Sequence, residues 1–149
     1  CLELAKHDSN LIRLSMARCL GFVDSPKARR VLIKLSRDND DDVRNWATFG
    51  LGSQCENNTK EIRAALYDRL NDDDEETRNE AILGLARRKI LDVLPALLQE
   101  LSAKPADRSP LATESARELL EPLREMVTTT EEPNQAVKNG IKEIEKFLD

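Results

Sequence analysis

One arginine-centred pattern occurs three times along the chain and constrains the fold more than any other feature. The segments "NLIRLSMARCLG" (10–21), "DDVRNWATFGLG" (41–52) and "EETRNEAILGLA" (75–86) align without gaps. The positions that match are Arg13, Arg44 and Arg78, then Met16, Ala47 and Ala81, then Leu20, Leu51 and Leu85. The arginines are 31 and 34 residues apart. A repeat of this period indicates stacked supersecondary units, each of which buries its apolar face against its neighbours.

Each copy of the arginine-centred pattern is preceded by another segment that is amphipathic at helical spacing. These segments cover residues 26–36, 60–70 and 92–101, and their apolar residues recur every three or four positions. A weaker fourth copy of the main pattern, "LATESARELLE" (111–121), has Thr113 in place of the arginine. The unit is therefore a first helix, a polar turn and a second helix, and the second helix is the one that carries the arginine-centred pattern.

The predicted fold class is all-α, a right-handed α-α superhelix of antiparallel helix pairs. No segment alternates apolar and polar residues as a half-buried strand does. We expect a single solenoid domain over residues 1–149, with a terminal helix that shields the last repeat. The expected repeats are 1–21, 26–52, 60–86 and 92–121, and the expected terminal helix is 133–148. Because the alignment places Cys1 inside a first helix, we also expect the chain to be a fragment of a longer repeat protein.

An Asp-rich turn followed by Val-Arg-x-x-Ala-x-x-x-Leu-Gly resembles the short bacterial HEAT-like repeat, which also occurs in phycobilin lyases. The resemblance covers about residues 1–121. Residues 38–101 resemble more closely a group of bacterial HEAT-repeat proteins, some of which are encoded beside Rhs-type toxin genes. The segments that carry this closer resemblance are "DVRNWATFGLG", "EIRAAL" and "EAILGLARR". It implies a scaffold that binds another protein, with toxin neutralisation as one concrete role.

The aspartate run "DNDDD" (38–42) has two interpretations, a calcium loop or a helix cap. A calcium loop that starts at Asp38 needs Gly at its sixth position and Glu at its twelfth. Those places hold Val43 and Phe49, so the metal interpretation fails. Acidic or small polar residues also precede the other second helices, at 7–10 and 72–76. Such residues accept hydrogen bonds from the free N–H groups of a helix start, so capping is the predicted role.

The resemblance also implies a role for the repeated arginines Arg13, Arg44 and Arg78. In HEAT-like families the matching arginine pairs with an acidic residue of an adjacent repeat and forms a ladder along the stack. The carboxylates expected to take part are Asp42, Asp73 and Glu76. The alternative is that the arginines bind an anionic ligand, since a guanidinium suits both carboxylates and phosphates.

Glycines lie near the ends of the second helices, at Gly21, Gly52 and Gly84. Glycine permits either a left-handed turn that ends a helix or a close approach of two helices, and both interpretations stay open here. No Gly-x-Gly-x-x-Gly motif is present, so a phosphate-binding loop is not predicted.

We predict no catalytic site, no metal and no cofactor. His7 is the only histidine, and Cys19 and Cys55 have no histidine near them in sequence. Cys19 falls on the expected core face of a second helix, where a buried thiol behaves as a small apolar residue. With an odd cysteine count, no signal segment and no apolar run of roughly 20 residues, the expected location is the cytoplasm, without a membrane span.

The predicted function is the binding of a protein partner on the concave face formed by the second helices. Rotation by 100° per residue turns seven side chains away from the apolar stripe. These candidate contact residues are Arg18, Asn45, Trp46, Phe49, Asn79, Glu80 and Leu83. Trp46, the only tryptophan, either anchors the partner or packs between repeats.

Two other classes remain as alternatives, a phycobilin-lyase-like chromophore binder and a nucleic-acid-binding solenoid. The net charge of −5 counts against nucleic acid, which is bound through clustered lysine and arginine. The oligomeric state is not predicted. The terminal helix, after the polar break "TTTEEPN" (128–134), either caps the last repeat or docks on a partner.

Overall fold

The structure is a computed structural model that describes residues 3–103, 109–130 and 134–149. Every regular element in these ranges is helical, which confirms the predicted all-α class. Three elements are single turns, namely the 3₁₀ helices η1 and η3 and a π-helical turn, η2. The elements are η1 (Leu4–Lys6), α1 (Asn10–Gly21), α2 (Pro26–Leu35), α3 (Asp41–Phe49), η2 (Gly50–Gln54), α4 (Lys60–Tyr67), α5 (Glu75–Arg87), η3 (Leu91–Val93), α6 (Leu94–Leu101), α7 (Pro110–Thr129) and α8 (Gln135–Leu148).

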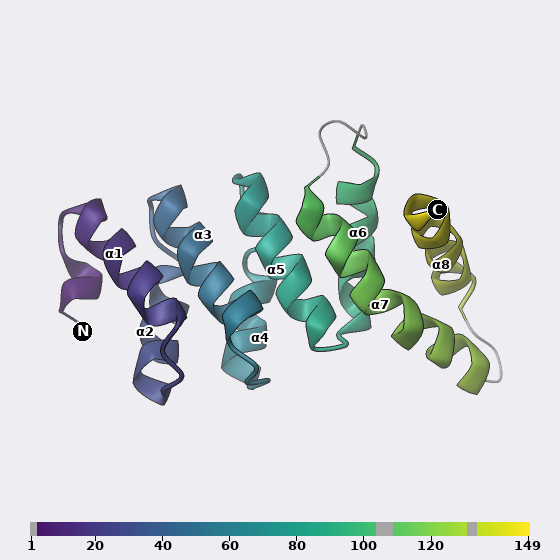
Figure 1. The fold of residues 1–149 in the computed structure, drawn as a ribbon, viewed down its shortest axis with the longest axis horizontal. Coiled ribbons are helices and arrows are strands. Elements are labelled where there is room, and N and C mark those ends of the chain that lie inside the picture. The colour runs from purple at the N-terminus through teal and green to yellow at the C-terminus, as the bar shows by residue number, and fades with distance from the viewer. Residues whose placement is uncertain (1–2, 104–108, 131–133) are drawn as a thin grey trace. The chain divides into compact units, whose positions relative to one another are not determined.

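The chain folds as two compact units, Cys1–Gly84 and Leu85–Asp149. In the first unit α1 packs against α2 and α3, and α2 packs against α3 and α4. Figure 1 shows α1, α3 and the start of α5 as one layer, with α2 and α4 as the other. We refer to the layer of α1, α3 and α5 as the second-helix layer. The core of the first unit lies between the two layers.

The apolar spacing of the repeat explains which side chains form this core. Val43, Ala47 and Leu51 follow one another at intervals of four and are fully buried. Val31 and Leu32 of α2, the helix that packs against α3, are also buried. An apolar stripe on each helix therefore fixes the pairing, because each CH₂ removed from water contributes about 0.8 kcal/mol.

The aspartates before α3 and α5 divide two tasks between them. Asp40 accepts a hydrogen bond from the N–H of Val43 at 3.1 Å, and Asp74 accepts one from the N–H of Thr77 at 2.7 Å. The capping role is thus confirmed for the second aspartate of each Asp-x-Asp pair. The first aspartates, Asp38 and Asp72, accept from the N–H of Asp40 and of Asp74 and turn toward an arginine instead.

Pairs of glycines bring neighbouring second helices into backbone contact. A Cβ atom on Gly50 would lie 2.9 Å from the Cα of Gly21, and one on Gly84 would lie 2.5 Å from the Cα of Gly52. In both pairs the first glycine lies eight residues after the repeat arginine and the second lies six residues after the next one. No described glycine has a positive φ, so the close-approach interpretation holds and the left-handed turn does not.

In the second unit α8 packs against both α6 and α7. Ile144 of α8 is fully buried, as are Leu119 and Leu123 of α7. Gly140 lies so close to α6 that a Cβ there would be 2.7 Å from a methyl group of Leu94. The helix α8 is therefore an integral layer of this unit.

Candidate interaction surface

Four side chains of α1, its C-cap and α3 form a group on the second-helix layer that we call the aromatic cluster: Arg18, Phe22, Trp46 and Phe49. The rings of Trp46 and Phe49 meet edge to face with centroids 5.5 Å apart, and those of Phe49 and Phe22 do so at 6.1 Å. The guanidinium carbon of Arg18 lies 4.7 Å from the centroid of the Trp46 ring. Edge-to-face rings and a stacked cation are each favourable by about 0.5–1.5 kcal/mol.

The local sequence explains how this cluster forms. Arg18 and Phe22 are four residues apart, and Trp46 and Phe49 are three apart, so each pair shares one side of its helix turn. The packing of α1 against α3, with the close approach of Gly21 in α1 to Gly50 at the start of η2, then brings the two sides together.

Exposure differs sharply between the members of the aromatic cluster. Trp46 and Phe49 are half-buried, whereas Arg18 is exposed and Phe22 is 67% exposed. Trp46 therefore packs between two repeats and also keeps part of its ring accessible. Phe22 is the member that faces solvent most fully.

The structure places the other predicted contact residues away from the solvent. Asn79 and Leu83 are buried, and Glu80 is 8% exposed and accepts a hydrogen bond from Ser53 at 2.7 Å. The expectation that these three present an open surface is corrected, because rotation about the axis of one helix takes no account of the packing around that helix. Asn45 is half-buried and donates to Glu76 of α5 at 2.8 Å.

Sequence reasoning missed two exposed apolar residues, Phe22 and Val23, which are 67% and 48% exposed. They directly follow Gly21, in the link between two helices. The sequence places both in a turn, but it does not show whether neighbouring helices cover them. Cys19 is also exposed, not buried as expected.

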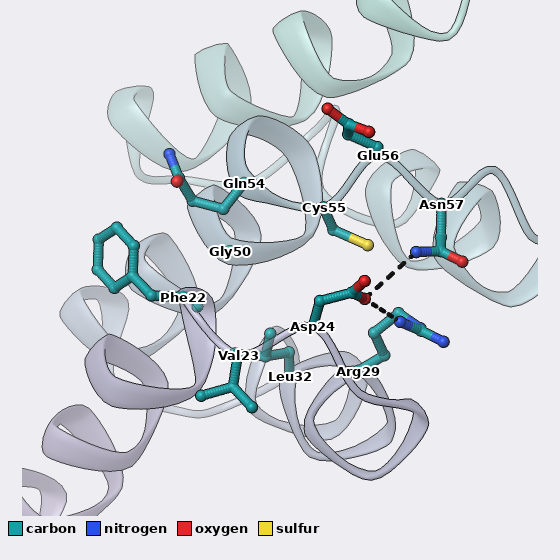
Figure 2. A pocket seen from close by; sticks show the side chains of 11 residues that line it. Phe22, Val23, Asp24, Arg29, Leu32, Gly50, Gln54, Cys55, Glu56 and Asn57 are labelled. Atoms are coloured by element: carbon teal, nitrogen blue, oxygen red, sulfur yellow. Dashed lines mark hydrogen bonds and ion pairs between the residues drawn. The ribbon is translucent and has the colours of Figure 1, made fainter.

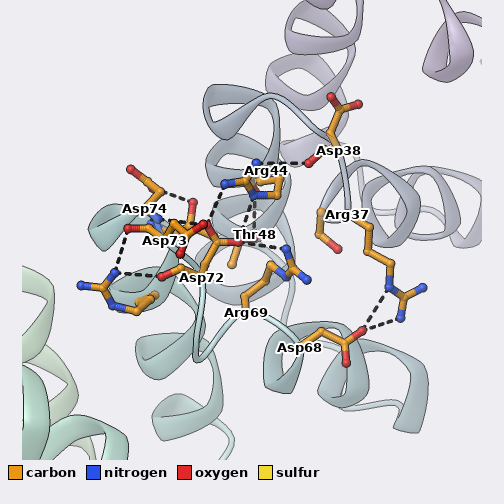
Figure 3. A network of polar contacts seen from close by, with 12 residues as sticks. Arg37, Asp38, Arg44, Thr48, Asp68, Arg69, Asp72, Asp73 and Asp74 are labelled. Carbon is orange, nitrogen blue, oxygen red and sulfur yellow. Dashed lines mark hydrogen bonds and ion pairs between the residues drawn. The ribbon is translucent and has the colours of Figure 1, made fainter.

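Arg13 and Arg44 connect consecutive repeats in the first unit, and Figure 3 shows the pair that Arg44 forms with Asp72. Arg44 donates from Nε and Nη2 to the two oxygens of Asp72, at 2.9 and 2.8 Å, and from Nη1 to the carbonyl of Asp38 at 3.2 Å. Arg13 binds both oxygens of Asp38 at 2.8 Å in the same way and donates to the carbonyl of His7. The paired carboxylates are thus Asp38 and Asp72. The expected partners were others, Asp42, Asp73 and Glu76, and the difference arises because the turn preceding each second helix presents its first aspartate.

The third repeated arginine, Arg78, donates from Nη1 to the carbonyls of Asp72 at 2.8 Å and Asp73 at 3.1 Å. Each arginine thus binds the carbonyl six residues before it, which ties the start of its own helix to the preceding turn. Arg13 and Arg44 hold a carboxylate of the next repeat as well, so their donors are used within the fold.

Burial and pairing act in opposite directions on the two paired carboxyls. Burial alone would raise the pKa of Asp72, but the hydrogen bonds from Arg44 and from the N–H of Asp74 outweigh it and hold that pKa below its ordinary value. Asp38 behaves alike, with Arg13 and the N–H of Asp40 as its partners, and its pKa is also lowered. Both groups are therefore ionised at neutral pH.

The only histidine of the chain, His7, lies in the turn before α1. His7 is exposed, and its Nδ1 accepts from the N–H of Ser9 at 3.0 Å, the turn contact that Asp38 and Asp72 make in the later repeats. No group of three or more His, Cys, Asp or Glu side chains in the described ranges is placed to hold a metal ion. None of the described helices combines the length and the apolar character that a bilayer crossing requires.

The family model for HEAT repeats matches residues 1–52 and 35–117, and the chain therefore belongs to the HEAT-repeat family. Among individual proteins it is similar to "Protein YibA" of Escherichia coli strain K12, with 37% identity over 93 residues. The match covers 62% of this chain and 33% of that protein, and YibA of strain O157:H7 gives the same values.

Solved structures agree with the family assignment. The X-ray structure of YibA from E. coli superposes with a TM-score of 0.68 at 29% identity, over 96% of this chain and 52% of that one. The crystal structure of an engineered protein superposes with a TM-score of 0.58 at 17% identity, over 98% and 78% of the two chains, and shows the fold alone. These likenesses fit an α-α solenoid. The chain spans about a third of the YibA sequences and about half of the YibA structure that it matches.

Proposed function

We propose that this chain is a non-enzymatic HEAT-repeat scaffold that binds a protein partner through the aromatic cluster. The observation that carries the proposal is the continuous set of rings from half-buried Trp46 through Phe49 to Phe22, which is 67% exposed. Aromatic residues and arginine dominate the binding energy of protein interfaces, and here four such residues are already assembled. Preassembly lowers the entropy lost on binding, because the side chains need little reordering.

The partner to test first is a toxin domain of the Rhs type. This choice rests on the resemblance of residues 38–101 to proteins of which some are encoded beside Rhs-type toxin genes. A toxin-neutralising scaffold would act by covering its partner's surface, for which no catalytic group of its own is needed.

The test uses the single tryptophan as a built-in reporter. Titration of the purified toxin domain into the purified chain should quench or shift the fluorescence of Trp46. Phe22→Ser should abolish the change. The matched control is Leu11→Ser, because Leu11 is 68% exposed on the same helix but outside the aromatic cluster. Equal binding by both variants would count against this surface, and no fluorescence change with wild-type chain would count against this partner.

A further inference from the structure

A pocket beside the aromatic cluster is formed where the second repeat departs from the first. Gly21 and Gly52 are aligned positions of the two repeats, and four residues follow Gly21 before α2 starts at Pro26, whereas seven follow Gly52 before α4 starts at Lys60. The later link, which includes the last residues of η2, is therefore three residues longer. This difference accounts for the change in the arginine interval from 31 to 34. In repeat proteins such insertions map to loops on one face, often the face that binds.

The extra residues wall a cavity of about 310 Å³ at the end of α1. Figure 2 shows the carboxylate of Asp24 between Arg29 and Asn57, with Phe22 on the opposite side. Glu56 belongs to the longer link and lines the same cavity. The cavity lies within the first unit and shares Phe22 with the aromatic cluster.

The polar lining favours a cationic occupant. Arg29 donates to Asp24 Oδ1 at 2.5 Å and Asn57 does so at 3.5 Å, so in the described contacts Oδ2 is available to another donor. The Asp24 side chain is 83% exposed, whereas that of Arg29 is 19% exposed with its charge already paired. With Glu56 added, the ionised groups of the lining carry a net charge of −1.

The apolar lining suits a long aliphatic stem. Phe22, Val23 and Leu32 contribute carbon surface to the cavity, and lysine and arginine bury such stems while the charged end reaches polar groups. The exposed ring of Phe22 also offers a face on which a cation can stack, as Arg18 already does on Trp46 nearby.

We propose that this pocket receives a lysine or arginine side chain of the protein partner that the aromatic cluster binds, an inference that rests on the proposed function. Asp24 and Glu56 would accept the charged end, and Phe22, Val23 and Leu32 would contact the stem. The partner would then present an apolar residue to the aromatic cluster with a basic residue beside it.

The probe for this inference is N-acetyl-arginine amide, compared with the uncharged N-acetyl-citrulline amide and the anionic N-acetyl-glutamate amide. Binding is followed by NMR as chemical-shift changes in the ¹⁵N-labelled full chain, at the side-chain amides of Gln54 and Asn57 and the backbone amides of Cys55 and Glu56. We expect saturable shifts with the arginine compound that weaken with added salt. The citrulline compound should bind at least about tenfold more weakly, because it lacks the charge.

Variants locate the interaction. Asp24→Asn combined with Glu56→Gln should weaken the arginine compound by about tenfold or more, while Glu61→Gln, an exposed carboxylate of α4 outside the lining, should leave it unchanged. Unfolding curves confirm that the variants stay folded. Equal shifts with citrulline, the same shifts with glutamate, or full binding by the double variant would each overturn the proposal.

The two proposals fail in different ways. If Phe22→Ser and Leu11→Ser bind the toxin domain alike while N-acetyl-arginine amide still shifts Gln54 and Asn57, the aromatic cluster is wrong as the interface but the pocket still takes a cation. If the cluster variants lose the partner and the arginine compound causes no shift at any concentration, the proposed function stands and the pocket assignment is wrong.

Discussion

Arg44 holds Asp72 by two parallel hydrogen bonds, from Nε at 2.9 Å and from Nη2 at 2.8 Å, across the boundary between two repeats. The Asp72 side chain is only 3% exposed and that of Arg44 is 15% exposed. The same chain contains an ion pair of the opposite kind, in which Arg37 and Asp68 are 53% and 45% exposed (Figure 3). A comparison of the two pairs therefore measures how burial changes the stabilisation that an ion pair gives to the folded chain.

Arg44→Met should lower the free energy of unfolding by roughly 3 kcal/mol, because it leaves the carboxylate of Asp72 buried with Arg69 as its remaining ionic partner. Arg37→Met should cost less than about 1 kcal/mol, since water screens an exposed pair. Urea unfolding of both variants measures the difference. Equal losses, or no loss for Arg44→Met, would contradict the role of the buried pair.

Acid should weaken the ion pair between Arg44 and Asp72. The pKa of Asp72 is lowered in the folded chain, so its stabilisation is complete above the unfolded value of about 3.9 and disappears as the pH falls through the lower folded value. Relative to Asp72→Asn, the wild-type chain should therefore be more stable by a constant amount from about pH 5 to pH 7. Urea midpoints measured down to about pH 2 should show that advantage shrinking. An advantage that stays constant into strong acid would argue against the lowered pKa.

Gly84→Ala should destabilise the chain by about 2–3 kcal/mol, because the new Cβ would lie 2.5 Å from the backbone of Gly52 and force the helices apart. This loss should occur although alanine favours a helix by about 1 kcal/mol. Gly21→Ala is the control, since its Cβ would meet Gly50 at an ordinary 3.4 Å. In thermal unfolding, the midpoint temperature should fall for Gly84→Ala and stay nearly unchanged for Gly21→Ala.

Trp46→Ala should reduce both stability and partner binding, since the ring is half-buried between α1 and α3 and half accessible. We expect a loss of about 2 kcal/mol in the free energy of unfolding, about half that of a fully buried aromatic residue. Phe22→Ser, at a position 67% exposed, should cost only about 0.5–1 kcal/mol, from its ring contact with Phe49, and still remove binding. Circular dichroism during urea unfolding measures stability, and isothermal titration calorimetry with the toxin domain measures binding, because Trp46→Ala removes the fluorescent reporter. Intact binding by Trp46→Ala would assign the ring to packing alone.

Ile144→Ala should destabilise the second unit by about 2–4 kcal/mol, because the side chain is fully buried where α8 meets α6 and α7. Deletion of residues 131–149 should cost more, since it removes all the packing of α8 against α6 and α7. A deletion variant as stable as the whole chain would show that α8 is a docking element, the alternative that its sequence left open. Differential scanning calorimetry of the two variants checks both expectations.

The repeat itself determined the fold class and much of the local structure. Apolar residues every three or four positions and an aspartate before each second helix define helices that can exist only as stacked pairs, because each has one face to bury. Chain-local rules of this kind predicted the cap at Asp40, which contacts an N–H three residues away. The sequence also singled out Trp46, the only tryptophan, as a residue that either anchors a partner or packs between repeats.

Tertiary structure decided the contacts and the burial that arise between one helix and the helices next to it. The choice of Asp72 over Asp73 as partner of Arg44, the contact of Gly52 with Gly84 and the burial of Asn79 follow from how one helix lies against the next. A helical wheel gives the direction of a side chain about its own axis but contains no information on what stands in that direction. The exposure of Phe22 has the same origin, because only the packed helices show that no core receives it.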